Sequence, residues 1–162
     1  MLYFQDLEDI LFSRHKSNQS DQFTVVSGYV QPIPVRKLNE LSIPCEVYYG
    51  MYGEQRISQN LHNSLVEIVG NSPKIILKYS LKPVHSKCYI WHQKGRIIDA
   101  LIGSANFTSM GLNSPFREVL STLHKNSYSE LDNYLKILKT ESLLCSSASV
   151  SFRSSNEVPN QR

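Results

Sequence analysis

The chain has 162 residues, with 17 lysines and arginines against 14 aspartates and glutamates, which gives a net charge of +3. This length is enough for one domain with its own core, and the weak positive charge permits a polyanionic partner without requiring one. No apolar run reaches the length of a membrane span and the N-terminus lacks the pattern of a secretion signal, so we expect no membrane association and a cytoplasmic location. The scattered cysteines, Cys45, Cys88 and Cys145, are expected to be reduced and structural.

The predicted elements of the first half alternate between helix and strand. Residues 2–12 carry apolar side chains at helical spacing and predict an amphipathic helix, followed by a polar loop at 13–22. Residues 23–30 and 45–50 are rich in β-branched and aromatic side chains and predict buried strands. Between them, Pro34 suits the first turn of a helix at 32–41. Residues 57–70 predict a helix that stops at Gly70.

The second half adds a hairpin and a final helix. Residues 73–79 predict a third strand, and residues 84–92 and 96–103 flank a hairpin turn. A further strand is predicted at 117–124 and a helix at 127–140, capped by Ser127 or Ser129. These elements predict an α/β domain over residues 1–141, a mixed β-sheet flanked by helices on both faces. Residues 142–162 are Ser-rich and aperiodic, which predicts a tail or linker leading to another domain.

Two His-x-Lys tripeptides compete for a chemical role. His92 and Lys94 fall at the predicted hairpin tip, so we interpret them as solvated turn residues. His85 and Lys87 fall at the start of the preceding strand, where residues two apart share a face and lie roughly 7 Å apart along it. Their imidazole and ammonium groups are therefore expected to point the same way.

The predicted hairpin brings the sequence GSAN beside this second pair. One patch then holds the His85 imidazole, the Lys87 ammonium, the Ser104 hydroxyl, the Asn106 amide and the backbone N–H groups after Gly103. Lysine supplies charge, serine and asparagine donate hydrogen bonds, and glycine admits close backbone approach, so the set suits a phosphate. An imidazole there can attack phosphorus or protonate a leaving oxygen. The same stretch is also consistent with a plain turn whose polar side chain caps a short helix.

These motifs resemble the signature of the phospholipase D superfamily: His-x-Lys, four residues, Asp, six residues, then Gly-Ser-x-Asn. HSK at 85–87 and GSAN at 103–106 match its two ends in order, but the Asp position holds His92 and the hairpin is four residues longer. Restriction endonucleases of the BfiI and NgoFVII type lack that Asp and place a glutamate beyond the Asn, here Glu118. The segments VSGYV, VYYGMYG and VHSKCYIW also look like the NgoFVII group, and the resemblance covers residues 20–140.

The resemblance implies a phospholipase D-like α/β/α sandwich and a DNA endonuclease that needs no divalent metal or other cofactor. His85 would form a phosphohistidine, while Lys87, Ser104 and Asn106 would hold the phosphate oxygens. Glu118 would orient the His85 imidazole and stabilise its charged form. A homodimer with a shared active site is implied, because the chain offers one usable copy of each motif. Relatives also use a C-terminal DNA-recognition domain, and some use an ATP-dependent helicase-like partner.

The ends of the predicted strands are further candidates for substrate contact. Ligands of open α/β sheets gather at strand ends, so we expect Ser27 and Tyr29, together with Gly103, to line the substrate site. A tyrosine there can stack on a base or pack in the core. The chain has no residues at metal-ligand spacing, which is consistent with chemistry in which lysine and imidazole replace a metal.

Two alternative functions remain open. The first is another phosphodiesterase or a phospholipase of the same superfamily. The second is a catalytically inactive DNA-binding or scaffold module, for which the missing signature Asp is the best argument.

Overall fold

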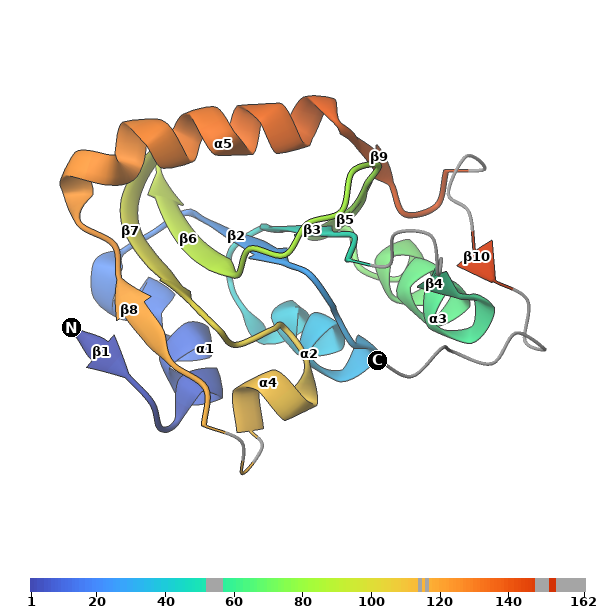
Figure 1. Cartoon of the computed structure of the whole chain (residues 1–162), viewed down its shortest axis with the longest axis horizontal. Helices are drawn as coiled ribbons and strands as arrows, with labels where there is room; N and C mark the ends of the chain where they lie inside the picture. Colours follow the sequence, from blue (N-terminus) through green and yellow to red (C-terminus); the bar gives the residue numbers. More distant parts are fainter. Residues whose placement is uncertain (52–56, 114, 116, 148–151, 154–162) are drawn as a thin grey trace.

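The computed structural model describes residues 1–51, 57–113, 115, 117–147 and 152–153. Its centre is an eight-stranded sheet in the order β1-β8-β7-β6-β2-β3-β5-β9 (Figure 1). The neighbours β2, β3 and β5 are parallel and the remaining pairs are antiparallel, so the predicted mixed sheet is confirmed. The strands are β1 (Leu2–Tyr3), β2 (Gln22–Ser27), β3 (Cys45–Tyr49), β5 (Ile75–Ser80), β6 (Cys88–Gln93), β7 (Arg96–Gly103), β8 (Leu120–Thr122) and β9 (Ser142–Leu144).

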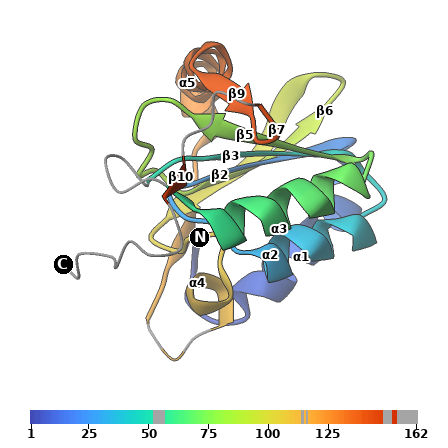
Figure 2. The same ribbon diagram turned by 90° about the vertical axis from the view of Figure 1, so that its right-hand side faces the viewer.

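Helices cover both faces of the sheet, as predicted (Figure 2). One face carries the larger core, in which the rings of Phe23 and Trp91 stack 4.9 Å apart. On the other face, Leu131 and Leu138 share a second core with Val26 and Ile90. The first face is covered by α1 (Leu7–Asn18), α2 (Pro32–Lys37) and α3 (Gln59–Gly70), and the second by α5 (Tyr128–Thr140).

Short elements complete the fold. They are the helix α4 (Ser109–Asn113), the 3-10 turns η1 (Leu38–Glu40) and η3 (Lys125–Ser127), and the parallel pair β4 (Ile57–Ser58) and β10 (Phe152–Arg153). No helix within the described residues has the length and apolar character that crossing a membrane takes.

The N-terminal segment differs from the prediction. Leu2–Tyr3 form a strand that pairs antiparallel with β8, and α1 begins only at Leu7 and continues to Asn18, through much of the predicted loop. Leu11 and His15 lie one and two turns beyond Leu7 and are buried with it. A histidine therefore continues the buried stripe, which is why the polar composition of residues 13–18 concealed the helix.

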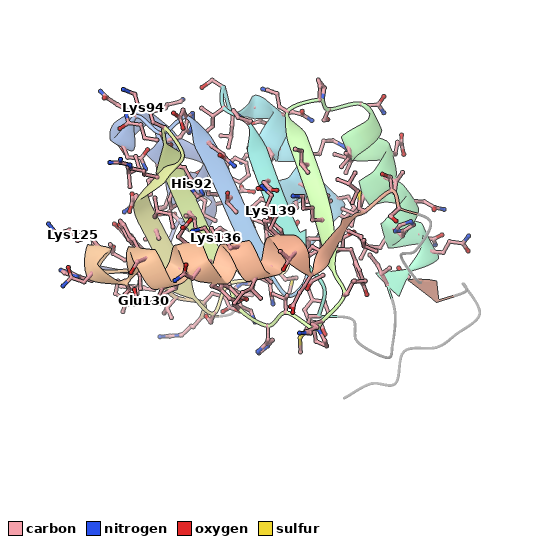
Figure 3. All side chains as sticks on the ribbon, turned by 90° about the horizontal axis from the view of Figure 1, so that it is seen from above. His92, Lys94, Lys125, Glu130, Lys136 and Lys139 are labelled. Atoms are coloured by element: carbon pink, nitrogen blue, oxygen red, sulfur yellow. The ribbon has the colours of Figure 1, made fainter. Side chains whose placement is uncertain are left out.

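The hairpin between β6 and β7 is confirmed, but the interpretation of His92 is wrong. The turn passes through Lys94 and Gly95, whose φ angles of 50° and 74° suit a tight two-residue hairpin turn. Because β6 runs to Gln93, His92 lies inside the strand, is 8% exposed and shares a 3.0 Å hydrogen bond with the hydroxyl of Thr24. Burial lowers the pKa of His92. Figure 3 shows it on the side of the sheet that α5 covers.

The C-terminal boundary predicted at residue 141 is too early. Ser142–Leu144 form the edge strand β9, antiparallel to β5, and the next residue, Cys145, is buried and donates its backbone N–H to the Leu77 carbonyl at 3.0 Å. The edge strand β9 is held by backbone hydrogen bonds on one side, so it does not need the apolar pattern that marks a central strand. The domain therefore extends beyond α5.

Candidate active site

The His-Ser-Lys segment lies in a loop rather than in a strand. Residues 83–87 have no regular structure, and β6 begins only at Cys88. The Gly103 N–H donates to the Lys87 carbonyl at 3.2 Å, so the start of the GSAN segment lies directly beside this loop. The predicted meeting of the two motifs is therefore found. The argument from strand alternation is not valid, however, because neither His85 nor Lys87 belongs to a strand.

Lys87 and His85 differ in their surroundings. The Lys87 side chain is buried and its Nζ donates to the backbone carbonyl of His85 at 2.7 Å, whereas the His85 imidazole is exposed. Burial lowers the pKa of Lys87, and the negative charge of Glu118 partly opposes this effect. The hydrogen-bond acceptor of this ammonium group is neutral and Glu118 offsets part of its charge, so the group can still bind a further anion at this site.

Asn106 is held by a cluster of hydrogen bonds at the end of β2. Its Oδ1 accepts from the Tyr29 N–H at 3.3 Å and lies 3.3 Å from the Ser27 Oγ. Ser27 Oγ donates to the Tyr29 carbonyl at 2.6 Å and accepts from the Phe107 N–H at 2.8 Å. Since Oδ1 is the accepting atom, the Asn106 NH₂ group has no partner in the part of the chain that the structure describes.

The residues predicted to line the substrate site fall into different environments. Ser27 is 0% exposed, so the prediction that it contacts substrate is replaced by a supporting role beneath Asn106. Tyr29 is 40% exposed and its side chain is accessible. Gly103 lacks room for a side chain because a Cβ there would lie 1.9 Å from the Val119 carbonyl oxygen. The close approach of the segment at Val119 thus accounts for a glycine at this position, and the predicted contact of Gly103 with substrate stays a prediction.

Ser104 links this cluster to Glu118. The Ser104 hydroxyl donates to the Glu118 carboxylate and accepts from the Val119 N–H at 3.1 Å, and the Ser104 N–H donates to the Val119 carbonyl at 3.0 Å. Glu118 was expected to orient His85. Within the described residues, no hydrogen bond or ion pair joins the two side chains, and Glu118 instead meets the site through Ser104 and the charge of Lys87.

One supporting group, Tyr89, was missed in the sequence, and another, Thr108, is the helix cap that the alternative interpretation of this stretch expected. The buried hydroxyl of Tyr89 donates to the Ala105 carbonyl at 2.8 Å, and Thr108 Oγ1 accepts from the Gly111 N–H at 2.9 Å and so caps α4. Tyr89 had a detectable signal, because a tyrosine inside an apolar strand needs a partner for its hydroxyl. A cavity of about 500 Å³ opens beside Glu118 and is lined by Phe4, Gln5, Asp6, Leu7, Gly111, Leu112 and Asn113.

The described side chains contain no cluster of three or more histidines, cysteines, aspartates or glutamates that could hold a metal ion. The groups gathered at this end of the sheet are one exposed imidazole, one buried ammonium, a hydroxyl, a carboxylate and an amide NH₂ without a partner among the described residues. Such a set can bind an anion and offer it a nucleophile.

Comparisons with known proteins agree with this architecture. The family model described as the NgoFVII restriction endonuclease N-terminal PLD domain matches residues 5–152. NucT from Helicobacter pylori superposes with a TM-score of 0.62 at 13% identity, over 89% of this chain and 97% of that one. Nuc from Salmonella typhimurium, a phospholipase D family member, superposes with a TM-score of 0.61 at 12% identity, over 89% and 95% of the two chains. No curated protein sequence matches the chain.

Proposed function

Because the chain belongs to the NgoFVII restriction endonuclease family through the N-terminal phospholipase D domain of that family, we propose that it is an endonuclease that hydrolyses DNA phosphodiester bonds without a divalent metal. The observation that carries this proposal is the buried ammonium of Lys87, which donates to the backbone carbonyl of His85 in the same loop that exposes the His85 side chain. The structural neighbours NucT and Nuc have the same fold, which is consistent with this proposal.

The first chemical step forms a covalent intermediate. An imidazole nitrogen of His85 attacks the phosphorus, the P–N bond forms as the bond to the 3′ oxygen breaks, and the leaving oxygen takes a proton from a second imidazole. In the second step water attacks the phosphohistidine, the P–N bond breaks, and the second imidazole accepts a proton from that water. The products are a 5′ phosphate and a 3′ hydroxyl, and the reaction is divided into two displacements at one nucleophile.

The phosphate oxygens are held by groups that already lie at the site. Lys87 has three N–H donors, of which one is used on the His85 carbonyl, so the others remain for a non-bridging oxygen. The NH₂ of Asn106, which has no partner in the described part of the chain, supplies a neutral donor. Ser104 contributes its hydroxyl once that group releases Glu118, and Glu118 balances the charge of Lys87.

The second imidazole comes from another copy of the chain. The described residues contain one His-x-Lys segment beside one GSAN segment, and a two-fold axis supplies the complementary pair from an identical subunit. In this arrangement the two copies of His85 face opposite sides of one phosphate. We further propose that sequence reading is left to a C-terminal DNA-recognition domain or to an ATP-dependent helicase-like partner, as the family resemblance implies.

The experiment is plasmid cleavage in excess EDTA. We expect full activity in EDTA, complete loss in His85→Ala, and little change in the control His124→Asn, which alters an exposed histidine outside the site. An acid-labile ³²P-DNA adduct should form on the wild type and be absent from His85→Ala. Loss of cleavage in EDTA with recovery on adding Mg²⁺ would contradict metal independence. Hydrolysis of phosphatidylcholine but not of DNA would indicate a phospholipase, and hydrolysis of neither would indicate an inactive module.

A further inference from the structure

The loop that carries His85 and Lys87 is held at its ends by backbone hydrogen bonds. The Val84 N–H donates to the Gly50 carbonyl at 3.4 Å, and the Lys87 carbonyl accepts from Gly103 at 3.2 Å. Between these points the loop has no strand or helix to fix it. The direction of an exposed imidazole in such a loop therefore depends on side-chain contacts.

Ser86, between the two residues, supplies one such contact. Its hydroxyl shares a 2.5 Å hydrogen bond with the hydroxyl of Tyr134, a residue of α5 that is 48 positions further along the chain. Tyr134 lies one turn from each of Leu131 and Leu138, which are buried in the core beneath α5. The ring of Tyr134 packs against that core, so its hydroxyl is presented to the loop from a rigid element.

We propose that Tyr134 is a positioning residue, which fixes the His85 imidazole for attack on phosphorus through its hydrogen bond to Ser86. This inference rests on the proposed function. Tyr134 touches neither the phosphate nor the imidazole and acts by limiting the conformations of the loop. A nucleophile that is held within a fraction of an ångström of its productive position reacts faster than one that samples several orientations.

Packing alone does not require this hydroxyl. A phenylalanine would bury the same ring against the second core, and only the oxygen reaches Ser86. Tyr128 provides a matched comparison on the same helix. Its ring packs against the same core, and its hydroxyl donates to the Ile98 carbonyl at 3.4 Å, on β7 rather than on the loop.

The test is a double-mutant cycle in the full chain, with cleavage of plasmid DNA followed in EDTA. We expect Tyr134→Phe and Ser86→Ala each to lower kcat by about ten-fold while KM changes little, in line with the loss of one hydrogen bond. The double variant should lose no more than either single variant, because both changes remove the same bond. Tyr128→Phe should keep wild-type kcat.

A second readout does not depend on activity. In ¹⁵N-histidine-labelled protein, the ring signals of His85, assigned with His85→Ala, should shift or broaden in Tyr134→Phe and in Ser86→Ala but not in Tyr128→Phe. The signals of His62, on α3, should stay unchanged in all of them. If the wild type cleaves no phosphodiester while the His85 signals respond in this way, the proposed function fails and the positioning contact stands.

Two results would overturn the proposal. One is a Tyr134→Phe variant with wild-type kcat and unaltered His85 signals. The other is an equal loss of kcat in Tyr134→Phe and Tyr128→Phe that follows a lowered thermal midpoint, since that pattern would assign both hydroxyls to stability alone.

Discussion

Replacing Gly103 with alanine should separate β7 from β8. A Cβ at this position would lie 1.9 Å from the Val119 carbonyl oxygen and 2.9 Å from the Leu120 Cα, whereas ordinary contact begins at 3.4 Å. The backbone segment at Val119 and Leu120 must therefore move away by about 1.5 Å, the difference between 1.9 Å and 3.4 Å. This movement stretches the two hydrogen bonds between Ser104 and Val119, which are 3.0 and 3.1 Å long.

The expected cost is about 3 kcal/mol. Two hydrogen bonds contribute about 1 kcal/mol each, and overpacking adds about 1 kcal/mol or more of strain. For a chain of this length the thermal midpoint falls by about 2–4 °C per kcal/mol, so the midpoint of Gly103→Ala should lie roughly 6–12 °C below that of the wild type. Cleavage should fall further than the folded fraction does, because Ser104 and Glu118 move together relative to Lys87.

Calorimetry and urea unfolding measure this loss, with Gly70→Ala as the matched control. Nothing lies within 4 Å of a Cβ built on Gly70, which ends α3, so alanine there should leave stability unchanged or raise it by up to about 1 kcal/mol. If Gly103→Ala unfolds and cleaves like the wild type, the close approach of Val119 does not restrain the site and the reasoning is wrong.

Three further predictions concern the proposed shared site, the buried imidazole of His92 and the cysteines. When wild-type and His85→Ala chains are exchanged in equal amounts, a shared site should leave about a quarter of the activity, by random pairing in a two-fold dimer, whereas separate sites would leave half. Burial lowers the pKa of His92 below its unfolded value, so the stability that neutral His92 contributes is complete above about pH 6.5 and is lost as the pH falls through that value towards the folded pKa. In urea unfolding between pH 7 and 5, the free energy of unfolding should therefore depend less on pH in His92→Gln than in the wild type. An equal pH dependence in the two proteins would contradict the assignment. Burial raises the pKa of Cys45 to about 12 and those of Cys88 and Cys145 to about 11, so Ellman's reagent should modify the native thiols far more slowly than the unfolded ones, and rapid labelling of the native chain would argue against this packing.

The central layers of the fold could be predicted from the sequence because their patterns are local. The apolar strands and the helix that ends at Gly70 are visible in single segments of about ten residues. The edge strands β1 and β9 could not be predicted in this way, since they are short and are positioned by partner strands that are distant in the sequence. The polar end of α1 was hidden for a related reason, because His15 is buried by neighbouring elements rather than by its own character.

The sequence was enough to locate the candidate site but not to predict the contacts of its side chains. The spacing of HSK and GSAN was enough to bring Gly103 beside Lys87. The role of Ser27 was misjudged because burial at the end of β2 depends on Phe107 and Asn106, about 80 residues away. The partner of Glu118 was misjudged because a loop position has no periodicity from which its direction can be derived.

The distribution of the site's contacts along the chain also bears on the order in which it folds. The two motifs flank the β6–β7 hairpin, so Lys87 and Gly103 meet by closing a loop of under 20 residues, which is a fast step with a small entropic cost. The contact between Asn106 and Ser27 instead joins residues that are 79 positions apart in the sequence, and the contact between Ser86 and Tyr134 joins residues that are 48 positions apart. We therefore expect the groups proposed to bind phosphate to assemble early in folding and to acquire their final geometry only when β2 and α5 dock, so that anion binding should precede catalytic competence during refolding.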